Sequence, residues 1–158
     1  STLMRSSAAS DVYKRQVYPC YKNQFQVGDA KEGATSIADM ETFGVKFDNG
    51  VEEWYPFDTE GWARRLATAK SITISVSGKR NIGDTGNDYV FNKTFKNGRD
   101  AEGYFGWTFP DGTIISWDAA VYNITNTGAG KSTEVGPLEF DVMSNGKPTI
   151  TLPSGGGA

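Results

Sequence analysis

Apolar and polar residues alternate along this chain in short runs that end at turns containing Gly. The most regular case is a pair of predicted strands whose apolar residues share one face each: Phe105, Trp107 and Phe109, then Ile115, Trp117, Ala119 and Val121. The loop Pro110-Asp111-Gly112 between them is typical of a three-residue hairpin turn, because Pro fixes the first turn position and Gly supplies a left-handed residue. Pairing Phe109 with Thr113 then brings both apolar sets together, and we expect Trp107 and Trp117 to lie in the core.

A second hairpin is predicted around Asp48-Asn49-Gly50. Apolar residues alternate with polar or small ones before this turn, and a further apolar run, residues 51–57, follows it. A two-residue Asn49-Gly50 loop would place Phe47 opposite Glu52, and both faces of the hairpin would be partly apolar. Such an arm should therefore pack under the domain or against another subunit. Its candidate subunit-interface residues are Phe43, Val45, Phe47, Trp54, Tyr55 and Phe57.

Two further strands follow from the same period of two. Residues 71–77 alternate Ile or Val with Ser or Thr, which predicts a half-buried strand with a row of small hydroxyls on its outer face. Residues 138–142 alternate apolar residues with carboxylates. A turn at Asn145-Gly146 then leads to a last strand at residues 149–152.

One helix is expected, at residues 85–96. Asp84 or Thr85 can cap its first free amides, and Asn97-Gly98 should end it. Residues 17–27 form an extended first segment. The predicted fold is therefore mainly β, a single-domain β-sandwich or barrel-like fold with one flanking α-helix and an extended hairpin arm.

Composition narrows the function classes. The chain has 158 residues, of which 37% are hydrophobic, and this is enough for one domain with a real core. No apolar run approaches the roughly 18 to 20 residues that cross a bilayer, and there is no large cluster of basic residues, so we expect neither a membrane partner nor a nucleic-acid grip. His is absent and Cys20 is the only cysteine, which excludes His-based acid/base catalysis, Cys/His zinc sites and an intrachain disulfide framework.

The first sixteen residues are excluded from the fold prediction. Residues 6–16, SSAASDVYKRQ, resemble the in-frame translation of a sequencing-library adapter. We therefore predict a non-native segment at residues 1–16, a β domain at residues 17–152 and a loose Gly-rich tail at residues 153–158. The first segment carries a net charge of +2, so the remaining residues carry −5 against −3 for the whole chain.

No catalytic or phosphate-binding set emerges from the sequence. Residues 128–133 are similar to the end of a phosphate-binding loop, but Thr125 stands where the pattern needs Gly, and no apolar helix follows. Glu52 and Glu53 are neighbours on a predicted strand, so they point to opposite faces and cannot act as an acid/base pair. Cys20 has no activating His, and we expect it to be a small buried hydrophobe. We predict no enzyme activity and no cofactor.

Metal and sugar sites have ordinary structural alternatives. A calcium loop starting at Asp84 would need an acidic ligand where Phe95 stands, so helix capping is the interpretation of this segment. Trp54 and Tyr55 lie on the predicted arm and are candidates for an exposed contact with either a sugar or another subunit.

Several segments of the chain, taken in order, resemble one family. They are residues 18–23 (YPCYKN), 49–58, 61–74, 78–84 (GKRNIGD), 86–88, 109–112 and 146–148. Together they resemble a major tail tube protein of siphovirus-type phages or prophages of Gram-positive bacteria. The resemblance covers essentially residues 17–152, and it implies a β-sandwich or barrel-like domain with one flanking helix and an extended loop.

The resemblance also implies a function and partners. Subunits of this family form hexameric rings that stack into a hollow tube through which viral DNA passes without specific binding. The implied partners are copies of the same chain, with tape measure and tail-terminator or initiator proteins, and the implied location is a virion tail assembled in the host cytoplasm. The alternative function is a non-catalytic carbohydrate-binding or adhesin-like β-sandwich module.

Overall fold

The structure is a computed structural model that describes residues 16–153. Apart from one residue each, the predicted adapter-derived segment and the Gly-rich tail lie outside the described residues. The described strands are β1 (Gln24–Gly28), β2 (Thr35–Ser36), β3 (Met40–Trp54), β4 (Arg64–Lys79), β5 (Glu102–Thr108), β6 (Ile114–Thr127), β7 (Pro137–Met143) and β8 (Thr149–Thr151). One α-helix, α2 (Thr85–Phe91), and short 3-10 turns at Cys20–Lys22, Phe57–Thr59 and Gly98–Ala101 complete the fold.

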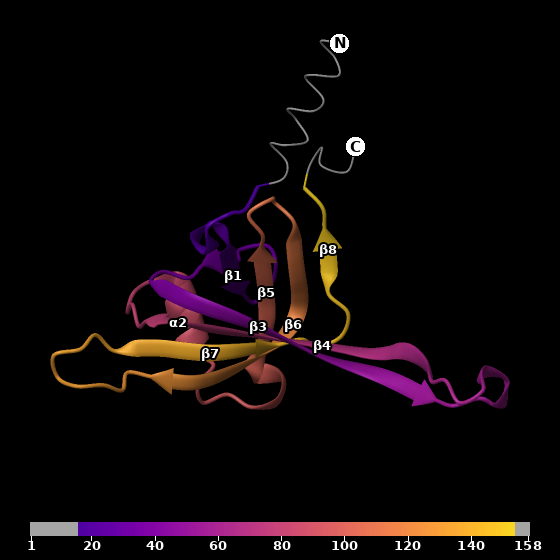
Figure 1. Ribbon diagram of the computed structural model, residues 1–158. Helices are drawn as coiled ribbons and strands as arrows, with labels where there is room; N and C mark the ends of the chain where they lie inside the picture. Colours follow the sequence, from indigo (N-terminus) through magenta and orange to yellow (C-terminus); the bar gives the residue numbers. More distant parts are fainter. Residues whose placement is uncertain (1–15, 154–158) are drawn as a thin grey trace, which may run out of the picture.

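All strands pair antiparallel in one sheet of order β2-β1-β5-β6-β7-β4-β3, with β8 added beside β6. The long strand β6 joins two parts of this sheet, because its first half pairs with β5 and β8 and its second half with β7. In Figure 1, strands β1, β5, β6 and β8 lie along one axis, and β3, β4 and β7 lie across it. The predicted fold class, mainly β with one flanking helix and an extended hairpin arm, is confirmed.

The core lies where these two parts of the sheet face each other. Its buried side chains come from both parts and, through Val90, from α2: Val27, Ile74, Val76, Val90, Phe105, Trp117, Ala120, Tyr122, Leu138, Phe140 and Val142. Residues 138–142 alternate as predicted, with three apolar side chains inward and two carboxylates outward. The last strand is also present, ending at Thr151.

The hairpin β5–β6 confirms its predicted turn and register. The Phe109 amide donates to the Thr113 carbonyl at 2.7 Å, and Trp107 lies opposite Ile115. Trp117 is buried and Trp107 packs against the core, as expected. The predicted face was wrong beyond Trp117, because β6 carries a bulge there: its residues 118 and 119 lie opposite the single β5 residue Tyr104, and this extra residue shifts the alternation.

The shift changes which side chains of β6 are buried. Ala120 and Tyr122 face the core, in place of Ala119 and Val121. Tyr122 also donates its hydroxyl to the carbonyl of Tyr104, the residue at the bulge. Burial in the core raises the pKa of the Tyr122 hydroxyl well above its ordinary value.

The predicted turn at Asn49-Gly50 was wrong. Strand β3 runs straight through it, with Asn49 opposite Lys70 and Gly50 opposite Ala69, and Phe47 pairs with Ile72 instead of Glu52. The ladder has a bulge next to Gly50. Glycine is favoured at this position because a Cβ on it would lie only 2.9 Å from the Ala69 Cβ. The local Asn-Gly preference thus yields to pairing with the longer strand β4.

Helix α2 begins where predicted and ends early. The Asp84 carboxylate accepts a hydrogen bond from the Asn87 amide at 3.0 Å, which confirms the cap. The helix ends at Phe91 instead of residue 96, and the chain continues in tight turns. The Thr94 hydroxyl donates to the Phe91 carbonyl and so competes with a further helical turn.

A buried polar cluster fixes α2 to the end of β4. Asn87 is fully buried and donates to the carbonyls of Ala38 and Lys79 at 3.2 and 2.9 Å. The Arg80 guanidinium donates to the Asn87 side-chain oxygen at 2.7 Å and pairs with Asp88 at 2.8 Å. We call these groups the Asn87 cluster, and they hold the segment before β3, the end of β4 and α2 together.

Candidate functional site

The outer part of the β3–β4 hairpin projects from the body of the molecule (Figure 1). We call residues 48–71 the arm. Strand β4 pairs with β7 only from Thr73 to Lys79, so beyond that point the ribbon has two strands and both of its faces meet water. The exposed large apolar side chains of the arm are Val51, Trp54, Tyr55, Phe57, Trp62 and Leu66. A monomer gains nothing from exposing so much apolar surface, which makes the arm a candidate contact surface.

The tip of the arm, residues 55–62, is an ordered turn. The chain passes through the 3-10 turn Phe57–Thr59 and reverses at Glu60 and Gly61, whose φ angles are 52° and 89°. The Thr59 hydroxyl lies 2.7 Å from the Trp62 carbonyl and 3.1 Å from the Pro56 carbonyl. Phe57 is fully exposed, and Trp62 is 79% exposed. With exposed Tyr55, the tip therefore presents three large aromatic side chains on a braced loop.

The six predicted interface residues fall into two groups. Phe43 and Val45 pack against the core, and the Phe43 ring lies 5.0 Å from that of Phe25. The other four lie along the hairpin from its root to its tip and are exposed: Phe47, Trp54, Tyr55 and Phe57. The structure therefore does not bring the six together, and their role in a subunit contact stays a prediction.

Three exposed arm residues were missed from the sequence: Val51, Trp62 and Leu66. Trp62 and Leu66 lie in a segment whose pattern fits a helical turn as well as a strand. With the turn placed at Asn49-Gly50, this segment fell outside the expected arm. The available signal was the long alternating stretch that ends at Lys79, which continues to the tip once β3 is paired with it.

An ion pair crosses the arm near its tip. The Arg65 guanidinium lies 2.8 Å from the Glu53 carboxylate, and the Tyr55 hydroxyl donates to the other oxygen of that carboxylate at 2.7 Å. The hydrogen bond from Tyr55, followed by Arg65, lowers the pKa of Glu53, and Glu53 raises the pKa of the Tyr55 hydroxyl. Glu53 thus links Tyr55 on β3's side of the arm to Arg65 on β4 and braces the arm.

The outer face of the sheet across β4, β7 and β6 is largely polar. Ser75 donates to Asp141 at 2.7 Å, and Asn126 donates to Glu139 at 2.7 Å. The row of small hydroxyls predicted for residues 71–77 lies on this face. The result is a surface of short polar side chains that carries the two carboxylates of β7.

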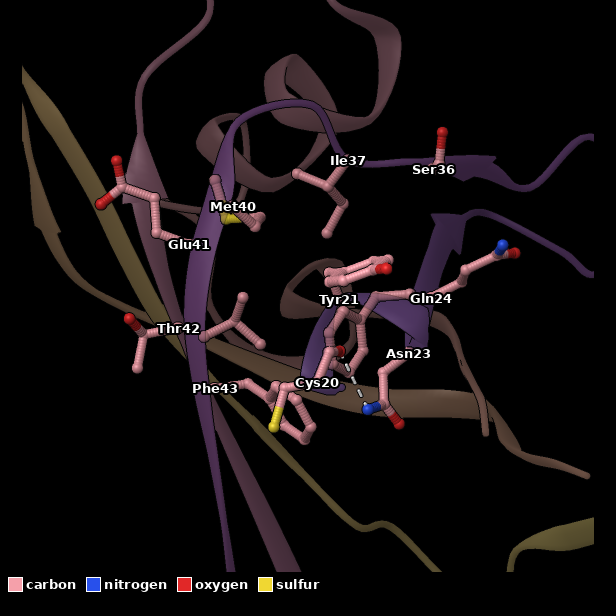
Figure 2. A pocket seen from close by; sticks show the side chains of 12 residues that line it. Cys20, Tyr21, Asn23, Gln24, Ser36, Ile37, Met40, Glu41, Thr42 and Phe43 are labelled. Carbon is pink, nitrogen blue, oxygen red and sulfur yellow. Dashed lines mark hydrogen bonds between the residues drawn. The ribbon is translucent and has the colours of Figure 1, made fainter. Parts of the chain in front are cut away.

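A cavity of about 550 Å³ lies between β1 and the start of β3 (Figure 2). Its walls mix apolar and polar side chains, including Tyr21, Met40 and Phe43. Its one acidic lining residue, Glu41, lies 3.7 Å from Lys79. Cys20, at the edge of this cavity, is exposed, so the prediction that it is buried was wrong. It sits in the 3-10 turn before β1, outside the alternating strand pattern that buries side chains.

Neither a metal-binding cluster nor a membrane-spanning helix is found among the described residues. Within residues 16–153, no group of three or more Cys, Asp or Glu side chains is arranged to hold a metal ion. Over the same described range, α2 is the only α-helix and it is far too short and polar to cross a bilayer.

Comparison with known proteins gives structural similarity alone. No family model and no curated protein matches the sequence. A chain from the tail of an empty gene transfer agent particle, refined with C6 symmetry, matches with a TM-score of 0.66 and 19% identity over 85% of this chain and 99% of that one. The sheath-tube complex of an extracellular contractile injection system, PVC, contains a chain that matches at 0.61 with 14% identity, over 90% of this chain and 97% of that one.

A third similar structure is the tube-terminating cap of the anti-feeding prophage. The TM-score is 0.56 at 12% identity, over 87% of this chain and 93% of that one. All three matches span nearly the whole of the other chain, so they cover the fold and not a fragment of it. The chain therefore has a tail-tube-like fold.

Proposed function

We propose that this protein is a major tail tube subunit that assembles into stacked hexameric rings and so forms the hollow conduit for DNA ejection. The observation that carries the proposal is the arm, an ordered two-stranded ribbon with exposed apolar side chains on a fold shared with chains of tail and tube assemblies. The C6 symmetry of one of those assemblies, the tail of the gene transfer agent particle, supports the hexameric ring.

The arm is suited to contacts between copies. When the arm of one copy packs on a different surface of the next copy, the contact is heterologous, and heterologous contacts close into rings or continue as helical stacks. A two-stranded ribbon is marginally stable by itself in water, and packing against a neighbour would bury Phe57, Trp62 and Leu66. Assembly would thereby stabilise the arm.

The polar outer face of β4, β7 and β6 is our candidate for the wall of the conduit. It presents Ser75, Asn126, Glu139 and Asp141, which are short side chains with two negative charges. Repeated around a ring, these charges repel phosphate, and DNA would pass without sticking. The net charge of −5 over residues 17–158 acts in the same direction.

The finer assignment rests on the sequence segments that resemble the family. We propose that residues 17–152 form the tube domain, that the source is a siphovirus-type phage or prophage of Gram-positive bacteria, and that the subunit is built into a virion tail in the host cytoplasm. Tape measure and tail-terminator or initiator proteins would be its further partners.

Exposed Trp54 and Trp62 favour one second candidate, a sugar-binding module, because a Trp face can stack on a sugar ring. Ligand sites are concave, however, and the aromatic side chains of the tip stand on a projecting turn. Retention of the chain on a glycan array, lost in Trp54→Ala, would support this candidate over the tube.

The test is negative-stain electron microscopy with light scattering on the purified chain at increasing concentration, with and without a tail-initiation complex. The proposal predicts rings or tubes of uniform diameter. A monomer at every concentration, with the initiation complex present, would overturn it.

A further inference from the structure

A second cavity, of about 460 Å³, lies at the root of the arm. Its walls come from β4 as it leaves the body, from the β7–β8 loop and from β8: Lys70, Ser71, Ile72, Ser144, Gly146, Lys147, Pro148 and Ile150. Two of these residues are basic and none is acidic, and Ile150 is 58% exposed. We call this the root cavity, and it combines an apolar floor with positive charge.

The walls of the root cavity are held in place. Ser144 and Ile72 exchange two hydrogen bonds, from the Ser144 amide to the Ile72 carbonyl at 2.9 Å and from the Ile72 amide to the Ser144 hydroxyl at 3.0 Å. The Trp117 indole donates to the Gly146 carbonyl at 3.2 Å, and the Asn145 side chain donates to the Ala119 carbonyl at 2.9 Å. A preformed cavity of this kind costs little ordering free energy when it is filled.

The tip of the arm has the complementary chemistry. It carries three exposed aromatic side chains, Tyr55, Phe57 and Trp62, together with the carboxylates of Asp58 and Glu60, and it has no basic residue within residues 55–62. Two basic residues follow the tip on β4: Arg65 is paired with Glu53 at 2.8 Å, and Arg64 lies opposite Trp54, below the loop that carries Asp58 and Glu60. An apolar, acidic tip thus exists on the same chain as an apolar, basic cavity.

The tip cannot fill the root cavity of its own subunit. Lys70 at the cavity and Arg64 near the tip are six residues apart on one strand, a separation of about 20 Å in extended backbone. Between them β4 pairs with β3, apart from a one-residue bulge at Thr68. A tip that fills this cavity would therefore have to come from another copy, and because tip and cavity are different surfaces, such a contact is heterologous.

We propose that the tip of the arm of one copy docks into the root cavity of the next, with Phe57 or Trp62 in the apolar floor and Asp58 and Glu60 facing Lys70 and Lys147. The proposal rests on the proposed function, in that it names the contact through which copies of this chain join. Each copy both donates a tip and accepts one.

Reversing the charges on each side gives a direct test. A tip variant carries Asp58→Lys and Glu60→Lys, and a cavity variant carries Lys70→Glu and Lys147→Glu. Alone, each variant places like charges in every contact, and we expect the concentration needed for assembly to rise at least about tenfold. Mixed in equal amounts, the variants can alternate so that every contact pairs opposite charges, and assembly should return toward that of the unaltered chain.

Folding and charge are controlled separately. Circular dichroism and urea unfolding should show that both variants keep the fold, because all four side chains are exposed. A matched control with Glu32→Lys and Asp100→Lys makes the same charge change as the tip variant on exposed loops outside the arm and should assemble normally. Raising the salt concentration should reduce the defect of each single variant.

The outcomes separate the two proposals. If the unaltered chain assembles and both variants assemble equally well, the docking proposal is wrong while the tube function stands. Failure of the equal mixture to recover, with both variants folded, would also overturn the docking. If the unaltered chain never assembles, the tube function fails and the docking fails with it.

Discussion

The two halves of strand β4 have the same kind of sequence and different surroundings. In the inner half, Ile74 and Val76 are buried between β3, β7 and the core, while in the outer half Leu66 is 60% exposed. Both halves pair fully with β3. The difference shows that pairing defines a strand, whereas only a third strand and an opposing layer make it part of a core. We infer that the inner half folds the protein and the outer half is available to assemble it.

The largest effect is expected in the inner half. Ile74→Ala truncates a fully buried side chain of the core, and it should lower the free energy of unfolding by about 3 kcal/mol. Urea unfolding followed by Trp fluorescence measures this. A loss below about 1 kcal/mol would break the comparison, because the inner half would then contribute little to the core.

A smaller loss of stability is expected at Asn87, the α2 residue that binds the end of β4. Asn87→Ala leaves the carbonyls of Ala38 and Lys79 and one Arg80 donor without their partner, and it should lower the free energy of unfolding by about 2 kcal/mol. Asn123→Ala, at an exposed position on β6, is the matched control and should leave it unchanged. Equal effects of the two substitutions would contradict a structural role for the Asn87 cluster.

In the outer half, Leu66→Ala should change the free energy of unfolding by less than about 0.5 kcal/mol. Leu66→Ala and Ile74→Ala both shorten an aliphatic side chain of β4. Any difference in their effects on stability therefore comes from the surroundings of the two residues. Light scattering should show weaker assembly for this variant. A destabilisation as large as that of Ile74→Ala would mean that the arm folds back onto the body.

The smallest effect concerns the titration of Glu53. Its pKa is lowered from the ordinary value of 4.5, first by the Tyr55 hydroxyl and then by Arg65, so folding favours the ionised form. This contribution is complete above pH 4.5 and is lost as the pH falls through the lowered pKa. Tyr55→Phe should raise the pKa of Glu53 toward its ordinary value, as measured by NMR of the side-chain carboxyl. An unchanged pKa would show that the hydroxyl does not hold this carboxylate in solution.

The sequence predicted those parts of the fold in which local and long-range preferences agree. At Pro110-Asp111-Gly112 the turn residues and the apolar alternation specify the same register, and the structure has it. The bulge in β6 between Trp117 and Ala120 was not predictable from alternation, because no turn residue marks it, yet its one extra residue reverses the buried face of the rest of β6.

Where local and long-range preferences disagree, the prediction from the sequence was wrong. Asn49-Gly50 is a strong turn signal, yet both residues lie in extended backbone, since continuing β3 gains a ladder with β4 that a two-residue turn would forgo. The true reversal at Glu60-Gly61 lacks an Asn-Gly signal. The arm was therefore expected from its apolar residues, but its length and its tip were not.

The candidate site was predictable only as a type of surface. Exposed aromatic residues on an arm were expected, and Trp54 and Tyr55 are indeed exposed. The root cavity was not foreseen, because its walls come from β4, the β7–β8 loop and β8, and only the folded topology brings them together. The exposure of Cys20 was missed because its residue type is usually buried.

The most direct test of the account is a variant in which residues 51–68 are replaced by an Asn-Gly turn, joining Gly50 to Ala69 where these residues already pair. Sedimentation velocity and urea unfolding of this variant should be compared with those of the unaltered chain. The account predicts a folded monomer whose unfolding free energy is within about 1 kcal/mol of the original and which never assembles. Normal assembly of the shortened chain, or its failure to fold, would contradict the claim that the inner half of the hairpin is needed for folding and the outer half for assembly.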